Sequence, residues 1–213
     1  MPRQPRPSPA RSRSRVPPQN ATISTASDPA CGSGPLTSES ILVDNGGLQN
    51  VFVYIKDPLG TQYAFETPTE PVKLDQKGCR YVPHVVGLRT AQPLEVLNSD
   101  STLHNVHGMP EANREFNRGQ PLPGVKDIAT FTTPEVLIRF KCDVHPWMHA
   151  YVGVVDHPFF AVSGSGGKFE LKTIPPGTYT IEAVHEKLGR QSQTVTLSEK
   201  DSKEITFTFK PAV

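Results

Sequence analysis

The residues best suited to chemistry lie in a short stretch after residue 140, where a cysteine, a histidine and a methionine follow at three-residue intervals. They are Cys142, His145 and Met148, and a further histidine, His104, lies upstream in the sequence Leu-His-Asn-Val-His. A thiolate, two imidazoles and a thioether form a soft ligand set that suits copper cycling between Cu(I) and Cu(II), with methionine as a weak axial ligand. Zinc accepts cysteine and histidine but gains little from a thioether. These residues therefore predict a metal site and favour copper over zinc.

Cys142 is expected to lie at the end of a strand, a position from which a side chain can serve as a metal ligand. In residues 136–142 the even positions are apolar and the odd ones include Arg139 and Lys141, so Cys142 shares the core-facing side with Ile138 and Phe140. Taken alone, each ligand type has an ordinary structural interpretation, such as an inert buried thiol or a methionine that fills the core. Their joint occurrence favours the metal site.

The order of these residues resembles the copper-binding signature of the cupredoxins, the small blue copper proteins, with a short amicyanin- or plastocyanin-like ligand loop. The resemblance covers roughly residues 71–158, and it implies one type 1 copper ion. The three equatorial ligands and the axial ligand that it implies are His104, Cys142, His145 and Met148. It also implies that Asn105 ties the two ligand-bearing loops together. Asp143 stands where the family usually has serine or threonine, so the local hydrogen bonding and the redox potential are expected to differ.

Four other histidines are expected to face solvent or to lie around the ligands. They are His84, His107, His149 and His157. His107 comes three residues after His104 and therefore faces the other side of a straight strand. His149 adjoins Met148 and could replace it as the axial ligand, which would give an open, non-blue site.

The elements that must position these residues are short strands. Alternating or β-branched segments bounded by turn residues occur at 40–44, 50–56, 93–98, 127–132, 135–141, 151–155, 168–172, 178–185, 192–197 and 203–209. The 22 prolines and 16 glycines suit strands joined by turns. Residues 109–119 could form a helical turn, but no amphipathic helix is evident. The predicted class is all-β.

A break at residues 163–167 precedes a C-terminal segment of different character. Its pattern Gly-x-Phe-x-Leu, followed by Pro-Pro-Gly-x-Tyr-x-Ile, resembles the carboxypeptidase regulatory-like (transthyretin-like) β-sandwich module, and it contains no peptidase residues. Four strands alone would leave one apolar face in water, so we expect strands from residues 38–56 to complete this sandwich. The two resemblances together imply a cupredoxin-type Greek-key β-sandwich at 31–158 and a small transthyretin-like β-sandwich at 159–213.

The first 30 residues differ in composition from the rest of the chain. They contain five arginines, one acid and seven prolines, and they lack the apolar segment of a secretory signal, so we expect a disordered basic tail. The remaining residues include 17 basic and 20 acidic side chains, which argues against a broad nucleic-acid-binding surface. The longest apolar runs have five residues, far short of the roughly 20 that a membrane-spanning helix needs.

Three cysteines allow at most one disulfide bond. Cys31 and Cys79 lie in apparent loops, and their pairing would attach the start of the domain to its body and leave Cys142 for metal. Such a bond implies an oxidising compartment, which the family resemblance makes periplasmic or extracellular.

The function expected from these observations is that of a one-electron carrier, not an enzyme. Pro146 and Trp147 would form the face that meets a donor or acceptor redox protein, with His145 near the surface as the route for electrons. A non-redox copper- or zinc-binding interaction protein is a second interpretation. An open-site copper enzyme is a third.

Overall fold

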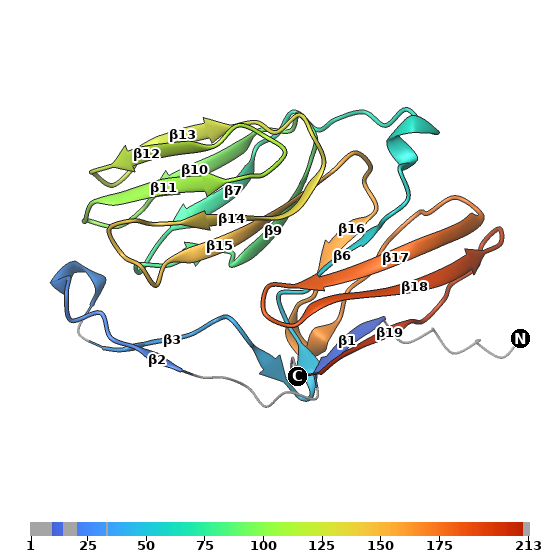
Figure 1. Ribbon diagram of the computed structural model, residues 1–213, viewed down its shortest axis with the longest axis horizontal. Helices are drawn as coiled ribbons and strands as arrows, with labels where there is room; N and C mark the ends of the chain where they lie inside the picture. Colours follow the sequence, from blue (N-terminus) through green and yellow to red (C-terminus); the bar gives the residue numbers. More distant parts are fainter. Residues whose placement is uncertain (1–9, 15–20, 33, 211–213) are drawn as a thin grey trace, which may run out of the picture. The chain divides into compact units, whose positions relative to one another are not determined.

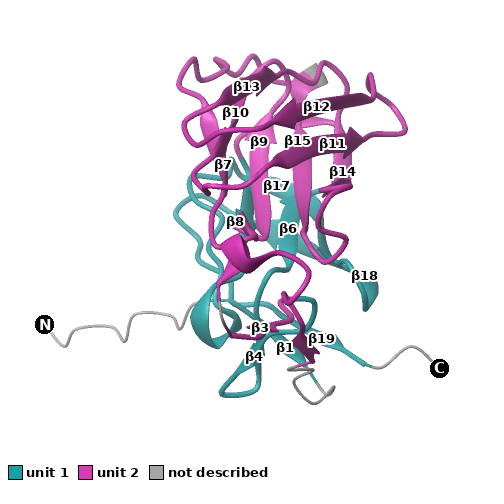
Figure 2. Ribbon diagram, turned by 90° about the vertical axis from the view of Figure 1, so that its left-hand side faces the viewer, with its two compact units in different colours: residues 1–19, 40–57, 159–213 teal, residues 20–39, 58–158 magenta. Residues whose placement is uncertain are grey.

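The structure is a computed structural model that describes residues 10–14, 21–32 and 34–210. The chain divides into two compact units, each assembled from segments that are distant in sequence (Figure 2). Unit 1 comprises Met1–Gln19, Ser40–Asp57 and Phe159–Val213, and unit 2 comprises Asn20–Glu39 and Pro58–Pro158. The four candidate ligands all lie in unit 2.

The described residues of unit 2 form two β-sheets and a short ribbon (Figure 1). The first sheet has the order β13-β10-β7-β8, with β7 (Val72–Gln76), β8 (Tyr81–Val82), β10 (Leu94–Asn98) and β13 (Lys126–Ala129). The second has the order β12-β11-β14-β15-β9, with β9 (Val85–Arg89), β11 (His104–Met109), β12 (Phe116–Gln120), β14 (Glu135–Lys141) and β15 (His149–Val155). The ribbon pairs β2 (Thr22–Ile23) with β3 (Leu36–Thr37), and the short 3-10 helices are η1 (Pro29–Cys31) and η2 (Leu59–Thr61).

Apolar side chains from both sheets meet in one core. Leu74 and Val96 from the first sheet and Ile138, Phe140 and Val152 from the second belong to a single buried cluster. In β10 and in the second half of β14 the buried side chains alternate with partly or fully exposed ones, which is the period of a strand with one buried face. Truncating a residue such as Phe140 to alanine would cost about 3–5 kcal/mol. This core fixes the strand ends from which the candidate ligands project.

Unit 1 also contains two four-stranded sheets among the described residues. One has the order β19-β1-β5-β4, with β1 (Arg11–Ser14), β4 (Val43–Asp44), β5 (Gly47–Leu48) and β19 (Thr206–Phe209). The other has the order β16-β6-β17-β18, with β6 (Phe52–Ile55), β16 (Phe160–Val162), β17 (Gly177–His185) and β18 (Gly189–Leu197). The short helix η3 (Ser165–Gly167) lies between β16 and β17 in sequence. The N-terminal strand β6 is thus inserted between two C-terminal strands.

One glycine in unit 1 is required by its surroundings. Gly167 has a φ of +68°, and a Cβ atom there would lie 2.0 Å from the carbonyl oxygen of Ser12 and 2.8 Å from the Cα of Gly47. A larger residue at position 167 would therefore clash with the backbones of β1 and β5.

The all-β class is confirmed, but several local expectations are wrong. Residues 168–172 form no strand, because only Lys168 makes a β-bridge, to Arg11. Residues 109–119 form no helix, and the end of this stretch instead starts β12, which pairs with β11. Strands β7, β9 and β11 were not expected.

The expectation of a disordered tail over residues 1–30 is also wrong where the structure describes that stretch. β1 pairs in parallel with β19, with Ser12 fully buried, and η1 and β2 belong to unit 2. The backbone pairing of β1 needs no large apolar side chains, and composition alone therefore did not reveal it. Residues 1–9 and 15–20 of the expected tail lie outside the described residues.

No helix in the described part of the chain has the length and apolar character needed to cross a bilayer.

Candidate metal centre

Two adjacent strands bring the first pair of candidate ligands together. His104 is the first residue of β11, and Cys142 directly follows the last residue of β14. These strands are antiparallel neighbours, with His107 opposite Lys141. The start of one and the end of the other therefore lie at the same end of the sheet, although the two residues are 38 positions apart.

Three ligand atoms converge in the interior of unit 2. Nδ1 of His104 lies 2.9 Å from Nδ1 of His145, and Sγ of Cys142 lies 3.9 Å from each of these nitrogens. All three residues are at least 98% buried. Atoms at these separations share a point about 2 Å from each, which is close to the bond lengths of metals to nitrogen and sulfur.

Each imidazole is held at its other nitrogen by a carboxylate. Nε2 of His104 lies 2.9 Å from Oδ2 of Asp100, and Nε2 of His145 lies 2.9 Å from Oδ2 of Asp28. Because an ionised carboxylate only accepts hydrogen bonds, these contacts assign the proton of each neutral ring to Nε2. The lone pairs on the two Nδ1 atoms then face each other, and at 2.9 Å they repel unless a cation lies between them. The residues present therefore fit a metal ion.

The electrostatics of the centre favour a neutral His104 and an ionised Asp28. Burial lowers the pKa of His104, and the hydrogen bond to Asp100 opposes that effect only in part. Hydrogen bonds from the Thr102 hydroxyl and the Ala30 N–H, followed by that of His145, lower the pKa of Asp28. A neutral imidazole beside an ionised carboxylate is the form that presents a free nitrogen to a metal.

The loop after β14 is folded back by its own backbone. The Cys142 N–H donates to the Met148 carbonyl, and the Met148 N–H donates to the His145 carbonyl. Met148 is 1% exposed and belongs to the same buried cluster as Cys142. The loop thus holds all three of its candidate ligands inside unit 2.

Asn105 joins the two ligand-bearing segments. Its backbone N–H lies 3.5 Å from Cys142 Sγ, its side-chain oxygen accepts the Asp143 N–H at 2.6 Å, and its side-chain NH₂ donates to Asp143 Oδ2 at 3.0 Å. Hydrogen bonds to Asp143, the largest of them from Lys141, place the pKa of its carboxyl well below the usual range. The hydroxyl of Tyr81 is also shared between the carbonyls of Asn105 and Lys141.

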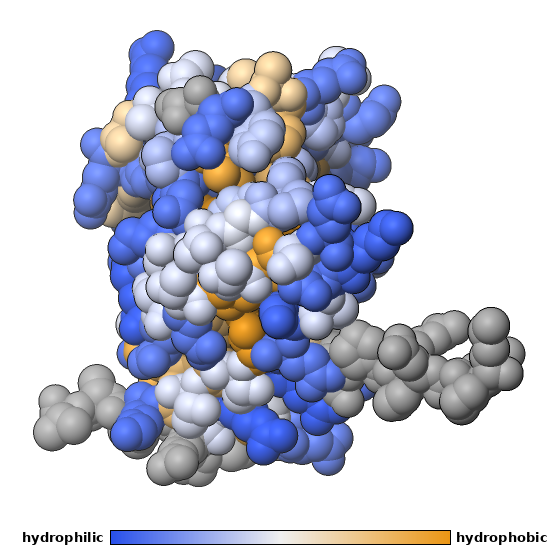
Figure 3. Space-filling model, turned by 90° about the vertical axis from the view of Figure 1, so that its right-hand side faces the viewer, coloured by the Kyte–Doolittle hydropathy of each residue, from blue (hydrophilic) through white to orange (hydrophobic). Residues whose placement is uncertain are grey.

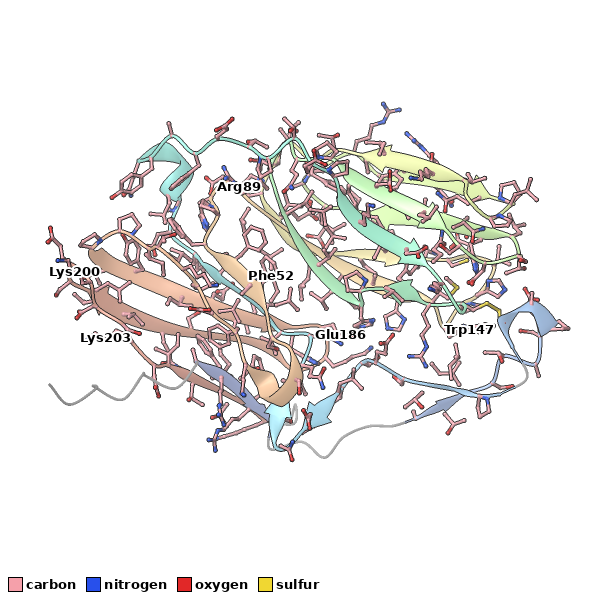
Figure 4. The ribbon with its side chains drawn as sticks, turned by 180° about the vertical axis from the view of Figure 1, so that it is seen from behind. Phe52, Arg89, Trp147, Glu186, Lys200 and Lys203 are labelled. Carbon is pink, nitrogen blue, oxygen red and sulfur yellow. A yellow bond between two sulfur atoms is a disulfide. The ribbon has the colours of Figure 1, made fainter. Side chains whose placement is uncertain are left out.

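A disulfide bond closes the other side of the centre. It joins Cys31 of η1 to Cys79, and Figure 4 shows it close to Trp147. The indole N–H of Trp147 donates to the Cys79 carbonyl, and its ring centroid lies 5.1 Å from that of His145. A ring nitrogen of His145 and the two disulfide sulfurs all lie within 4.8 Å of one another.

The expected electron-transfer face is only partly exposed. Pro146 is exposed and Trp147 is half-buried, but His145 is only 2% exposed. The expectation that the His145 ring lies near the surface is therefore wrong, because Asp28 and the disulfide-bonded η1 cover it.

The other candidate histidines lie outside the group of three converging atoms. His107 contacts Asp143 through Nδ1 at 3.0 Å and Glu115 through Nε2 at 2.7 Å. His149 donates from Nδ1 to the Trp147 carbonyl, and its ring meets that of His84 edge-on at 5.2 Å. His157 is buried.

The two carboxylates, those of Asp100 and Asp28, were not predicted from the sequence. Asp100 precedes His104 by four residues and is a visible candidate. Asp28 lies 117 residues before His145 in a stretch that was assigned to a tail. Its one local signal is the sequence Asp-Pro-Ala-Cys, in which Asp28 caps η1 by accepting the Ala30 N–H.

Unit 1 contains an open cavity of about 540 Å³ without comparable chemistry. Its apolar lining includes Phe169, Ile181 and Val195, and Lys200 and Lys203 also line it (Figure 4). Figure 3 shows hydrophobic surface between hydrophilic side chains on one face of the molecule. The lining residues include no cysteine or histidine, so the candidate centre remains that of unit 2.

Comparison with known proteins finds similarity among solved structures. A copper-containing nitrite reductase from Thermus scotoductus is 17% identical to this chain, with a TM-score of 0.39. The alignment covers 48% of this chain and 28% of the reductase chain. A purple cupredoxin from Nitrosopumilus maritimus is 21% identical, with a TM-score of 0.33, and the alignment covers 38% of this chain and 97% of the cupredoxin. Amicyanin from Paracoccus versutus is 17% identical, with a TM-score of 0.36, and the alignment covers 48% of this chain and 96% of amicyanin. No family model matches the chain, and no curated protein matches it.

Proposed function

We propose that unit 2 is a copper-binding electron carrier of the cupredoxin type with one type 1 copper ion. His104, Cys142 and His145 would hold the ion, and Met148 would supply a further, weaker thioether ligand. The observation that supports this proposal best is the convergence of Cys142 Sγ with the Nδ1 atoms of two imidazoles, each of which contacts a carboxylate through its Nε2.

Copper, when bound, supplies a one-electron couple between Cu(II) and Cu(I). The residues of this chain supply the rigidity that such a couple needs. Asp100 orients the His104 ring, Asn105 fixes the segment after Cys142, and burial of the ligands excludes water. A centre held by the same contacts in both oxidation states rearranges little when an electron arrives or leaves.

A carrier role is favoured over catalysis by the burial of the ligands, since none of the three converging residues is more than 2% exposed. We propose a redox protein as partner and, because of the Cys31–Cys79 bond, a periplasmic or extracellular location. The second candidate is a non-redox zinc site, which the two carboxylate–histidine pairs favour because such pairs are common around zinc.

A metal titration with a matched pair of variants tests the proposal. The purified full chain is titrated with Cu(II) and, separately, with Zn(II), and the copper form is cycled with a mild reductant and oxidant. We expect tighter binding of copper and reversible bleaching of a visible band. Met148→Ala should shift that band, whereas Met109→Ala, at a residue 37% exposed on β11, should not. Tighter binding of zinc with no redox cycling would instead support the zinc site.

We propose no metal site or redox role for unit 1. The likeness of its C-terminal part to transthyretin-like modules stays a prediction, and we propose it as a structural or interaction module.

A further inference from the structure

The described residues 21–32 and 34–39, here called the cap, contribute a side chain to the candidate metal centre. Oδ2 of Asp28 lies 2.9 Å from Nε2 of His145 and 2.7 Å from the Thr102 hydroxyl. Oδ1 of the same carboxylate accepts the Ala30 N–H at 2.8 Å. One oxygen therefore caps η1, and the other serves the centre.

We propose that Asp28 is a positioning residue of the copper centre: it fixes the ring of His145 and its negative charge favours Cu(II) over Cu(I). This inference rests on the proposed copper function. It assigns the cap a role that its position in the sequence does not suggest.

A disulfide bond anchors the cap close to the residue that contacts His145. Cys31 follows Asp28 by three residues and is bonded to Cys79, and the backbone N–H groups of Gly78 and Cys79 donate to Asp100 at 2.7 and 2.8 Å. Asp100 in turn holds His104. A single loop, tied to the cap by the disulfide, thus anchors the carboxylate partners of both imidazoles.

The sign of the effect follows from the charges. With the Cys142 thiolate and the two carboxylates, a centre with Cu(II) would have a net charge of −1, and a centre with Cu(I) would have −2. Like charges repel, so the additional negative charge of the reduced centre is unfavourable beside Asp28 and Asp100, whose side chains are only 22% and 12% exposed. Removing one carboxylate should therefore stabilise the reduced form relative to the oxidised form.

Asp28→Asn separates this role from that of a helix cap. Asparagine caps helices about as well as aspartate, so η1 should keep its first hydrogen bond while the charge is lost. Glu135→Gln is the matched control. Its carboxylate also accepts backbone N–H groups in unit 2, from Glu111 and Ala112, but contacts none of the residues of the centre.

The experiment is a potentiometric titration of the copper-loaded full chain. We expect Asp28→Asn to raise the reduction potential, increasing the ratio of Cu(I) to Cu(II) affinity by about tenfold, the order expected from the loss of one unit charge several ångströms away in a partly hydrated site. Glu135→Gln should leave the ratio unchanged, and Asp28→Glu, which keeps the charge, should lie closer to the wild type. Equal ratios in Asp28→Asn and Glu135→Gln would overturn the proposal.

A second readout uses the metal-free protein, so that failure of the copper function is distinguishable. In the nitrogen-15 NMR spectrum, the Nε2 proton of His145 should be protected from exchange in the wild type and lose that protection in Asp28→Asn and Asp28→Ala. If the wild type binds no copper but shows this protection, the proposed function fails while the positioning contact stands. If protection is absent in the wild type, the positioning role is wrong.

Discussion

Nδ1 of His104 faces Nδ1 of His145 at 2.9 Å, and Nε2 of each ring contacts a different aspartate, Asp100 for His104 and Asp28 for His145. Two neutral imidazoles gain nothing from such an approach, because each presents a lone pair to the other. The two aspartates hold the rings in this arrangement against the repulsion, which supports the proposal that a metal ion binds between them. The thiol of Cys142 completes the set from the neighbouring strand.

Replacement of the thiol tests its assignment as a ligand. Cys142→Ser should remove the intense charge-transfer absorption of the copper form, because sulfur supplies the covalency of the site. The metal-free variant should stay within about 2 kcal/mol of the wild-type free energy of unfolding, the order of the cost of burying a hydroxyl. Absorption spectra and denaturant unfolding measure the two effects. Full colour in the variant would show that Cys142 is not a ligand.

The disulfide predicts a defined pattern of thiol labelling. In denaturant without reductant, one thiol, that of Cys142, should react with an alkylating reagent, and all three should react after reduction. Replacing both Cys31 and Cys79 by serine should lower the free energy of unfolding by roughly 4 kcal/mol, since the bond spans 48 residues. Mass spectrometry of the labelled protein checks the pattern. Three reactive thiols in protein made in an oxidising compartment would contradict the pairing.

Trp147 is expected to contribute to docking with a redox partner. It is half-buried beside exposed Pro146, and aromatic residues are enriched at interface centres. Trp147→Ala should slow electron self-exchange between copper-loaded molecules, measured by NMR line broadening, and leave copper affinity and the spectrum unchanged. Because the indole also donates to Cys79, a shifted spectrum with unchanged exchange would instead assign Trp147 a supporting role at the centre.

Unit 1 should lose stability in acid through Glu182. This carboxylate is 2% exposed, and although its burial raises the pKa, hydrogen bonds from Lys56, Tyr54 and Arg190 lower it to about 2. Because the folded-state pKa lies below that of an unfolded glutamate, the stabilisation is complete above about pH 4.5 and is lost as the pH falls toward 2. Thermal unfolding of the wild type and Glu182→Gln between these pH values should converge. Parallel curves would show that Glu182 contributes no pH dependence.

The sequence was sufficient to predict the all-β class and a compact group of candidate ligands, because both depend on local patterns. Alternation in residues 135–141 placed Cys142 on the core-facing side, and three-residue spacing placed His145 and Met148 in one loop. The structure brings Cys142 and His145 together with His104, which antiparallel pairing of β11 with β14 positions.

The contacts around the ligands could not be predicted in the same way. The contact of Asp28 with His145 joins residues 117 positions apart, and it depends on a short helix held by a distant cysteine. The burial of His145 depends on the same segment. The composition of residues 1–30 indicates a stretch too polar to fold, but backbone pairing, a disulfide and the partly buried Asp28 carboxylate order the described part of it without a large apolar contribution.

The absorption spectrum of the full chain with one equivalent of Cu(II) shows whether Cys142 and the two imidazoles form a blue copper site. We expect an intense visible band from thiolate-to-copper charge transfer, which bleaches on one-electron reduction and returns on oxidation. A copper complex with only weak visible absorption, or a chain that binds no copper while its Cys142 thiol is reduced, would contradict this expectation.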